Sequence, residues 1–395
     1  MIPELRARFN AGWTEARHRA LLDRLGARVG VPIEFPVSET PCFLPDALAR
    51  ELADTGAILT AQALAPEALA AADAAVPARF RGPNGGAVPL FVQVDFGLVR
   101  GEDGVVRPKL VELQAFPSLY GFQLALGEAF RETYAVDPGL GLAFGGLSPA
   151  DATALVRQVL VGDHDPAEVV LMEIAPERQK TRPDFVLTEQ IWGVHTADTA
   201  DIVVEGRRMF HRRDGRLVPV RRVYNRVIPD ELERSGLALP FDYRDDLDVE
   251  WGGHPAWYFR VSKISIPRLS HPSVPRTWFL HEVDELPLPR ERLLLKPLFS
   301  FAGGGIVFAP TTDDLAAIPP EARRGYILQE RIDFTPLIDT PDGATQAEIR
   351  VMYVWADGPR AVFPLVRMGR GRMMGVDHNK GLRWVGASAA FIGGA

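Results

Sequence analysis

The sequence is poor in cysteine. Cys42 is the only one among 395 residues, which excludes a disulfide within the chain, and such usage is typical of a reducing compartment. Long hydrophobic runs are also missing: nowhere do about 18 apolar residues follow one another, so we expect no membrane span. The stretch 1–30 mixes Arg, Glu and His with Leu and Ala, which predicts an amphipathic surface helix rather than a secretory signal. We therefore expect a cytoplasmic protein with no membrane partner.

An excess of positive charge is missing as well. Lys and Arg number 44 against 51 Asp and Glu, a net charge of −7. This balance argues against a nucleic-acid partner, because phosphate backbones select clustered basic residues. The eight histidines are scattered without a motif, which favours neither a zinc site nor a Ser-His-Asp arrangement. No Gly-Lys-Ser/Thr opens a helix, so a Walker A loop is excluded.

What the chain has is the composition of an ordinary globular protein, with 47% hydrophobic and 24% charged residues. Its length exceeds what one hydrophobic core supports, so we expect two or three lobes. The pattern places boundaries near 160 and 240 and divides the chain into 1–160, 161–240 and 241–395. Strands alternate with helices in the middle region, which predicts an α/β lobe, and mixed α+β structure follows. A homodimer is left open.

The expected elements follow from apolar periodicity and turn residues. A helix is expected over 61–75, and Asp242–Gly253 is expected to be an acidic linker. The runs 88–94 and 109–113 predict an antiparallel hairpin. Further expected helices cover 119–134 and 184–193, and further strands cover 168–174, 202–204, 218–227, 293–297, 305–308, 326–330 and 347–355.

The strongest single feature is an apolar strand that ends on Lys296 and is followed by a loop, 300–305, ending in Gly303, Gly304 and Gly305. Glycines let backbone N–H groups approach phosphate oxygens, and an ammonium neutralises them. The alternative is a hairpin with a flexible turn and a surface lysine.

An acid-x-amide pair lies earlier in the chain. Glu112 and Gln114 share a strand face, and Asp95 closes the neighbouring strand. Carboxylate and amide oxygens suit Mg²⁺. The apolar neighbours indicate a partly buried strand whose carboxylate needs a cation, and Lys109 as a structural counter-ion remains the alternative.

Three more segments carry candidate residues. Glu348 and Arg350 share one strand face, either as a surface ion pair or as ligands of a metal-bound phosphate. Gln329 and Glu330 end a strand that either offers an adenine site or exits to solvent. At another strand end, Arg226 could clamp a carboxylate or phosphate. The basic cluster of Arg367, Arg370 and Arg372 is typical of solvated surface.

In their order along the chain, these segments resemble the ATP-grasp superfamily, and in particular the eukaryotic-type glutathione synthetases. Asp95-Phe96 followed by Lys109-Leu110-Val111-Glu112-Leu113-Gln114 is similar to that family's Asp-Tyr followed by Lys-x-x-Glu-x-Asn. The run 326–332 is similar to its Ile-Leu-Met-Glu-Lys/Arg-Ile hinge. The region 201–226, with an Asp214-Gly215 turn, resembles the glutathionylspermidine-synthase-like, circularly permuted ATP-grasp proteins.

The resemblance covers roughly residues 90–390 and implies an ATP-grasp fold with a preceding doubly wound lobe, together with ATP and Mg²⁺ as cofactors. It implies that Lys263 and Lys296 hold the ATP phosphates under the glycine loop, and that Glu112 and Gln114 meet the metal. The adenine site and nearby nucleotide contacts would be Gln329, Glu330, Ile332 and Glu348. We assign Arg226 and Arg350 to catalysis, and the substrate site to Asp95, Ser118, Tyr120 and Arg372.

Three positions depart from that family's pattern. Gln114 replaces an asparagine, Ser300 stands where a further acidic metal ligand is usual, and Gln93 replaces an arginine that binds the substrate carboxylate. The segment 115–120 also differs from the family's substrate loop.

These observations predict an ATP-dependent carboxylate–amine ligase that works through an acyl-phosphate, with a small-molecule acid and amine as substrates. Two alternatives stay open. One is phosphotransfer to a non-carboxylate acceptor, and the other is a non-catalytic ATP-binding or scaffolding protein, for which Ser300 is the best indication.

Overall fold

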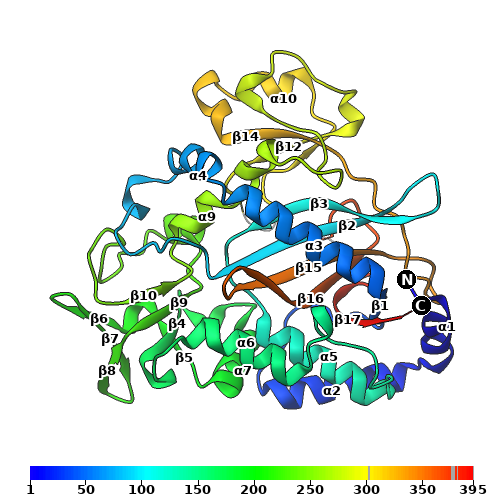
Figure 1. Ribbon diagram of the computed structural model, residues 1–395, viewed down its shortest axis with the longest axis horizontal. Coiled ribbons are helices and arrows are strands. Elements are labelled where there is room, and N and C mark those ends of the chain that lie inside the picture. The colour runs from blue at the N-terminus through cyan, green and yellow to red at the C-terminus, as the bar shows by residue number, and fades with distance from the viewer. Residues whose placement is uncertain (301–302, 375–378, 380, 395) are drawn as a thin grey trace.

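The computed structural model describes residues 1–300, 303–374, 379 and 381–394. It shows a mixed α+β protein whose centre is a six-stranded sheet in the order β1-β17-β16-β15-β2-β3 (Figure 1). The strands of this sheet come from both ends of the chain, and they are β1 (Cys42–Pro45), β2 (Phe91–Arg100), β3 (Val106–Gln114), β15 (Gln346–Trp355), β16 (Pro359–Gly369) and β17 (Gly386–Gly393). The sheet therefore joins the first and third regions expected from the sequence.

Helices cover the two faces of this sheet. α3 (Asp46–Ala63) lies along one face, and α2 (Glu15–Val29) and α5 (Tyr120–Tyr134) lie together on the other side of the molecule (Figure 1). The remaining helices are α1 (Pro3–Gly12), α4 (Pro66–Asp73), α6 (Pro149–Val161), α7 (Arg182–Trp192), α8 (Pro229–Ser235), α9 (Ala256–Arg260) and α10 (Thr312–Ala316). Within the described residues, no helix combines the length and apolarity needed to cross a membrane.

Strand alternation gives the sheet an apolar face and a polar face. Val92, Val94 and Phe96 of β2 belong to the core that packs against α3, so Gln93 and Asp95 point the other way. A β-bulge at Val111 changes the phase of β3: Leu110 pairs with Phe96, whereas Glu112 pairs with Asp95. The bulge keeps Leu110 in the core while turning Glu112 to the polar face, which strict alternation would forbid.

A second sheet is parallel, in the order β10-β9-β4-β5. It consists of β4 (Val169–Glu173), β5 (His195–Asp198), β9 (Arg222–Asn225) and β10 (Glu250–Gly252). The predicted strand over 202–204 does not join it. That strand, β6 (Ile202–Glu205), forms a separate antiparallel sheet with β7 (Arg208–Arg213) and β8 (Arg216–Val220). Asp214 and Gly215 take positive φ between β7 and β8, as a two-residue hairpin turn requires.

The third sheet is antiparallel and lies at the top of Figure 1, in the order β11-β14-β12-β13. Its strands are β11 (Thr277–Phe279), β12 (Leu293–Pro297), β13 (Val307–Phe308) and β14 (Tyr326–Glu330). All three sequence-predicted strands of this region are present. Residues 301 and 302 of the expected glycine loop lie outside the described residues.

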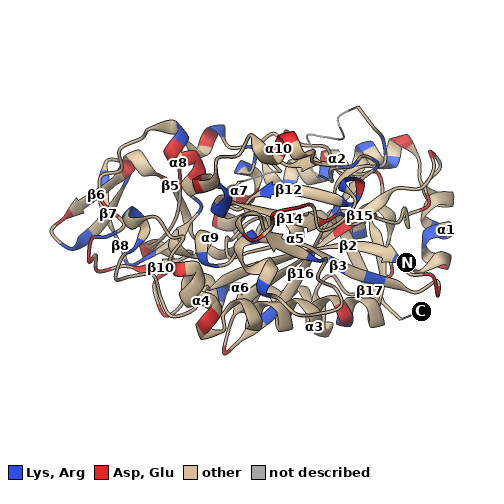
Figure 2. Ribbon diagram, turned by 90° about the horizontal axis from the view of Figure 1, so that it is seen from above, with Lys and Arg blue, Asp and Glu red and all other residues tan. Residues whose placement is uncertain are grey.

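Several expectations were wrong in detail. The supposed linker 242–253 ends in β10, and Val249 and Trp251 are buried, because aromatic packing draws this acidic segment into the parallel-sheet core. The helix expected over 61–75 is broken, since Pro66 starts a new helix. The strand expected over 218–227 is two strands, and β16 and β17 were not foreseen. Acidic and basic residues are distributed over the whole length of the molecule (Figure 2).

Candidate functional site

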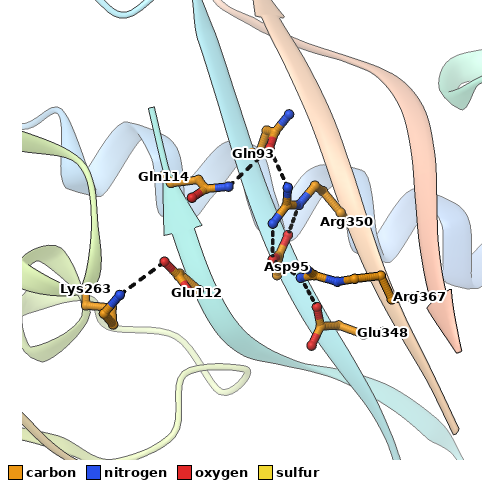
Figure 3. A network of polar contacts seen from close by, with 8 residues as sticks. All are labelled: Gln93, Asp95, Glu112, Gln114, Lys263, Glu348, Arg350 and Arg367. Carbon is orange, nitrogen blue, oxygen red and sulfur yellow. Dashed lines mark hydrogen bonds and ion pairs between the residues drawn. The ribbon is translucent and has the colours of Figure 1, made fainter. Parts of the chain in front are cut away.

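Charged and amide side chains from four adjacent strands meet on the polar face of the central sheet (Figure 3). Arg350 on β15 lies opposite Asp95 on β2. Its guanidinium donates to both Asp95 carboxylate oxygens, at 2.5 and 2.7 Å, and to Oε1 of Gln93 at 2.8 Å. Asp95 and Arg350 are both buried. This bidentate geometry holds the guanidinium in a fixed orientation.

A second arginine completes what we call the Asp95 network, made up of Gln93, Asp95, Glu348, Arg350 and Arg367. Arg367 on β16 donates to Asp95 at 2.5 Å and also to Glu348. Burial favours a neutral Asp95, but Arg350 and Arg367 outweigh it and lower the pKa of that carboxyl. For Glu348, burial prevails and raises the pKa, against the attraction of Arg367.

Gln93 and Gln114 connect this network to β3. The Gln114 amide donates to Oε1 of Gln93 at 3.2 Å, and the Gln93 amide donates to the backbone oxygen of Ser118 at 2.8 Å. The Gln93 side chain is therefore engaged by other groups of the protein in this structure, and it anchors the segment that leads into α5.

Glu112 faces a lysine from a distant part of the chain. Lys263 Nζ lies 3.4 Å from Oε1 of Glu112 and donates to the backbone oxygen of Ser300 at 2.9 Å. The Lys263 side chain is 5% exposed and that of Glu112 is 32% exposed. Lys109, the counter-ion considered from the sequence, instead donates to the backbone oxygen of Pro272 at 2.7 Å. Glu112 is thus paired with the Lys263–Arg268 segment, which in turn contacts the loop after β12 through Ser300.

Lys296 is a buried residue rather than a surface lysine. It is 5% exposed and donates to Oε1 of Gln329 on β14 at 2.5 Å. Burial lowers the pKa of Lys296 to about 8; the charges of Glu112 and Glu348 oppose this change, and that of Lys263 adds to it. Gln329 is the hydrogen-bond partner of Lys296, and the three charged groups act on it through space.

The glycine loop needs its glycines. Gly303 and Gly305 take φ of 76° and 73°. A Cβ on Gly303 would lie 2.3 Å from Cε of Met373, and one on Gly305 would lie 2.8 Å from Cγ of Pro297. Both glycines take a left-handed backbone that larger residues rarely adopt, and at Gly305 the Pro297 ring also leaves little room for a Cβ.

A small cavity lies among these groups. Its volume is about 10 Å³, room for roughly one water molecule. We call it the Lys263 cavity, and it is lined by Glu112, Gln114, Tyr258, Ser262, Lys263, Leu298 and Ser300. Buried polar atoms without a partner among the described residues cluster in and near it: Tyr258 Oη and Ser300 Oγ in its lining, and Gln329 Nε2 beside Lys296.

The oxygen donors around the cavity limit how a magnesium ion can bind there. Within the described parts of the chain, no group of three or more His, Cys, Asp or Glu side chains is placed to hold a metal ion. Glu112 and Gln114 still offer a carboxylate and an amide oxygen side by side. Mg²⁺ commonly takes one or two protein carboxylates and completes its shell with water and substrate phosphates. The residues therefore fit a metal that arrives with a phosphate, and not one held by protein alone.

Other sequence-predicted residues lie away from this cavity's lining. Arg226 is buried beside the segment 116–118, where it donates to the backbone oxygen of Pro117 and lies 5.0 Å from the ring centre of Phe116. Tyr120 donates to the backbone oxygen of Tyr353 at 2.7 Å. Ser118 meets the network only through its backbone oxygen. In this structure, these contacts hold the 116–120 segment in place.

Glu330, Ile332 and Arg372 are also peripheral. Glu330 pairs with Arg276 at 3.0 Å and with Arg292. Ile332 is half-buried just after β14, and Arg372 is exposed. A wider depression of about 440 Å³, lined by the segment 266–277, borders β14 because Thr277 pairs with Gln329.

Sequence reasoning missed four residues of the site: Tyr258, Ser262 and Leu298 in the cavity lining, and Arg367 in the network. Tyr258 was not singled out, because an aromatic run at 257–259 is typical of packing. Arg367 was taken as solvated surface, because the strand that carries it was not foreseen; buried Val366 and Met368 on either side were the available signal.

Comparison with known proteins supports the fold. No protein-family model and no curated protein matches the sequence. Among solved structures, a glutathione synthetase-like effector from Globodera pallida in its apo form matches with a TM-score of 0.61 and 13% identity, over 96% of each chain. At this identity the likeness concerns the fold alone. The protein therefore has a glutathione synthetase-like fold.

Proposed function

We propose that this protein is an ATP-dependent carboxylate–amine ligase. One observation carries the proposal: Glu112 and Lys263, which lie 151 residues apart, line one cavity, and the charges of both act on the buried Lys296. Two ammonium groups at one place suit a polyphosphate. The glutathione synthetase-like fold is consistent with ligase chemistry.

In the proposed reaction, a substrate carboxylate attacks the γ-phosphoryl group of ATP, an acyl-phosphate forms, and an amine captures it with release of ADP and phosphate. Lys263 and Lys296 would neutralise phosphoryl oxygens, and Glu112 and Gln114 would ligate Mg²⁺, which supplies further charge neutralisation. The glycine loop would keep water away from the acyl-phosphate.

The Lys263 cavity is far too small for a nucleotide. Binding therefore requires the β11–β14 sheet to move away from the central sheet, which would break the contact between Lys263 and the Ser300 backbone. Closure over bound substrate would restore it. Such opening and closing is the usual way in which an enzyme both admits a nucleotide and excludes water.

The test is to incubate the protein with Mg-ATP and panels of amino acids, other acids and polyamines. ADP formation and an ATP-dependent dehydration product, detected by mass spectrometry, are the expected result. Release of AMP instead of ADP would contradict acyl-phosphate chemistry. A phosphorylated product with no amide would mean phosphotransfer.

One observation favours a second function, a nucleotide-binding protein without turnover. Glu112 is the sole carboxylate that lines the Lys263 cavity in the described structure, since Ser300 is neutral. In that case calorimetry would detect ATP binding while no substrate panel yields ADP.

A further inference from the structure

The Lys263 cavity is very small, and most of the side chains that line it are polar. Its volume of about 10 Å³ holds a single oxygen-sized atom. Three donor side chains line it, those of Lys263, Tyr258 and Ser300, and Gln114 and Ser262 add further polar groups. The Glu112 carboxylate also lines it, and Lys263 offsets its negative charge at 3.4 Å. A cavity with this lining is suited to one anionic oxygen.

Tyr258 is the most informative of these donors. It lies on α9 and is 7% exposed, yet its hydroxyl has no partner among the described residues. Phe116 and Phe259 pack edge-on against its ring, with ring centres 6.5 and 5.2 Å away, and they hold the hydroxyl in place. An unpartnered buried hydroxyl costs free energy unless a ligand completes it. Because burial raises the pKa of Tyr258, the group remains a donor.

Ser300 supplies the second unpartnered hydroxyl. Its Oγ is buried without a partner among the described residues, while its backbone oxygen accepts from Lys263. The lysine thereby holds the loop after β12 beside the cavity, and the side chains of Ser300 and Tyr258 belong to the same lining.

We propose that the hydroxyls of Tyr258 and Ser300 form an oxyanion subsite that binds one non-bridging phosphoryl oxygen next to Lys263. The identity of the phosphoryl donor rests on the proposed function, but the subsite itself does not. The Lys263 ammonium disfavours a cation at this position, whereas Glu112 and Gln114 offer the carboxylate and amide oxygens that a metal would take. Tyr258 and Ser300 are thus substrate-contacting residues.

The chain offers a matched control. Tyr243 is 5% exposed, belongs to the same aromatic cluster as Tyr258, and also has a buried hydroxyl without a described partner. It does not line the cavity. Tyr243→Phe and Tyr258→Phe therefore make the same chemical change in the same core, and only the second removes a cavity donor.

The experiment measures binding of inorganic triphosphate and, separately, of Mg²⁺ with β,γ-imido-ATP, by calorimetry on the full chain. Tyr258→Phe should weaken both by roughly tenfold to a hundredfold, as expected for a hydrogen bond to a charged group. Its melting temperature should not fall, since the deleted hydroxyl has no partner. Ser300→Ala should weaken binding in the same direction, and Tyr243→Phe should bind like wild type.

Unchanged binding by Tyr258→Phe would overturn the subsite and leave the cavity as a water site only. Equal weakening by Tyr243→Phe would overturn it too, because the effect would then come from packing. If wild type bound triphosphate but not the ATP analogue, and Tyr258→Phe weakened the triphosphate, the subsite would stand while the proposed function failed. Binding of neither ligand to wild type would overturn both.

Discussion

The Asp95 network lies on the polar face of the central sheet, and the Lys263 cavity adjoins that sheet through Glu112 and Gln114 of β3; the two differ in how well their polar groups are satisfied (Figure 3). In the network, Asp95 accepts three charge-assisted hydrogen bonds and Arg350 donates to two residues. In the cavity, two hydroxyls have no described partner, and the ion pair between Lys263 and Glu112, at 3.4 Å, is a loose one.

This contrast separates supporting residues from binding residues. The ion pairs of the network join β2, β15 and β16 and use most of its buried donors. Nε of Arg367 is the exception, with no partner among the described residues, so the network keeps less capacity for a ligand than the cavity does. A cavity whose donors lack acceptors gains more from an anionic ligand than it loses in desolvation. We infer that the network is the platform and the cavity is the place where substrate binds.

The largest expected effect is a loss of stability when the Asp95 network is broken. Asp95→Asn leaves Arg350 and Arg367 without their shared carboxylate, and we expect a loss of about 3–5 kcal/mol in the free energy of unfolding. Denaturant titration measures it. The control is Asp103→Asn, which removes an exposed ion pair with Arg107 on the same hairpin and should change little. If both variants were equally stable, the network would not support the fold.

The next effect separates binding from stability. Lys263→Met removes the cavity's ammonium, and we expect triphosphate affinity to fall by roughly tenfold to a hundredfold. The stability should change much less than in Asp95→Asn, because Glu112 is partly exposed and keeps access to water. Lys109→Met is the control on the neighbouring strand. Calorimetry measures the affinity, and denaturant titration of the same samples measures the stability. If Lys263→Met were destabilised as much as Asp95→Asn, Lys263 would be a supporting residue like those of the network.

A third prediction concerns pH. With its pKa lowered to about 8, Lys296 is charged below that pH and neutral above it in the free protein. Anion binding favours the charged form, so affinity for triphosphate should be steady below pH 8 and then fall, by up to about tenfold per pH unit. Stability of the free protein should move the other way above pH 8, since the unfolded chain then binds more protons. In Lys296→Arg the affinity profile should be flat, and a flat profile in wild type would contradict the assignment.

The smallest expected effect concerns the metal. Ser300→Asp adds a second carboxylate beside the cavity, which should strengthen Mg²⁺ binding in the presence of β,γ-imido-ATP by roughly threefold to tenfold. The same change should weaken triphosphate binding without Mg²⁺, because the new charge repels it. Ser300→Ala should leave the Mg²⁺ dependence unchanged. A weaker Mg²⁺ dependence in Ser300→Asp would place the metal elsewhere.

Much of the local structure could be predicted from the sequence. The hairpin that carries Asp95 and Glu112, the helix 120–134 and the strand ending on Lys296 all follow from apolar periodicity and turn residues. Prediction failed where long-range packing decided the outcome. β16 places Arg367 in the buried network. The residues around Arg367 in the sequence do not indicate that it pairs with Asp95 and Glu348. Tyr258 was equally invisible, since an aromatic residue in an apolar run is typical of core.

By itself the sequence determined which chemical groups were available and on which strand faces: Glu112 with Gln114, Glu348 with Arg350, and a lysine before a glycine loop. Only the tertiary structure decided which of them meet. The bulge at Val111 turned Glu112 toward Lys263, 151 residues away, and the pairing of β15 with β2 brought Arg350 to Asp95, 255 residues away. Periodicity acts within a strand, whereas charge pairing and burial depend on contacts between strands far apart in the chain.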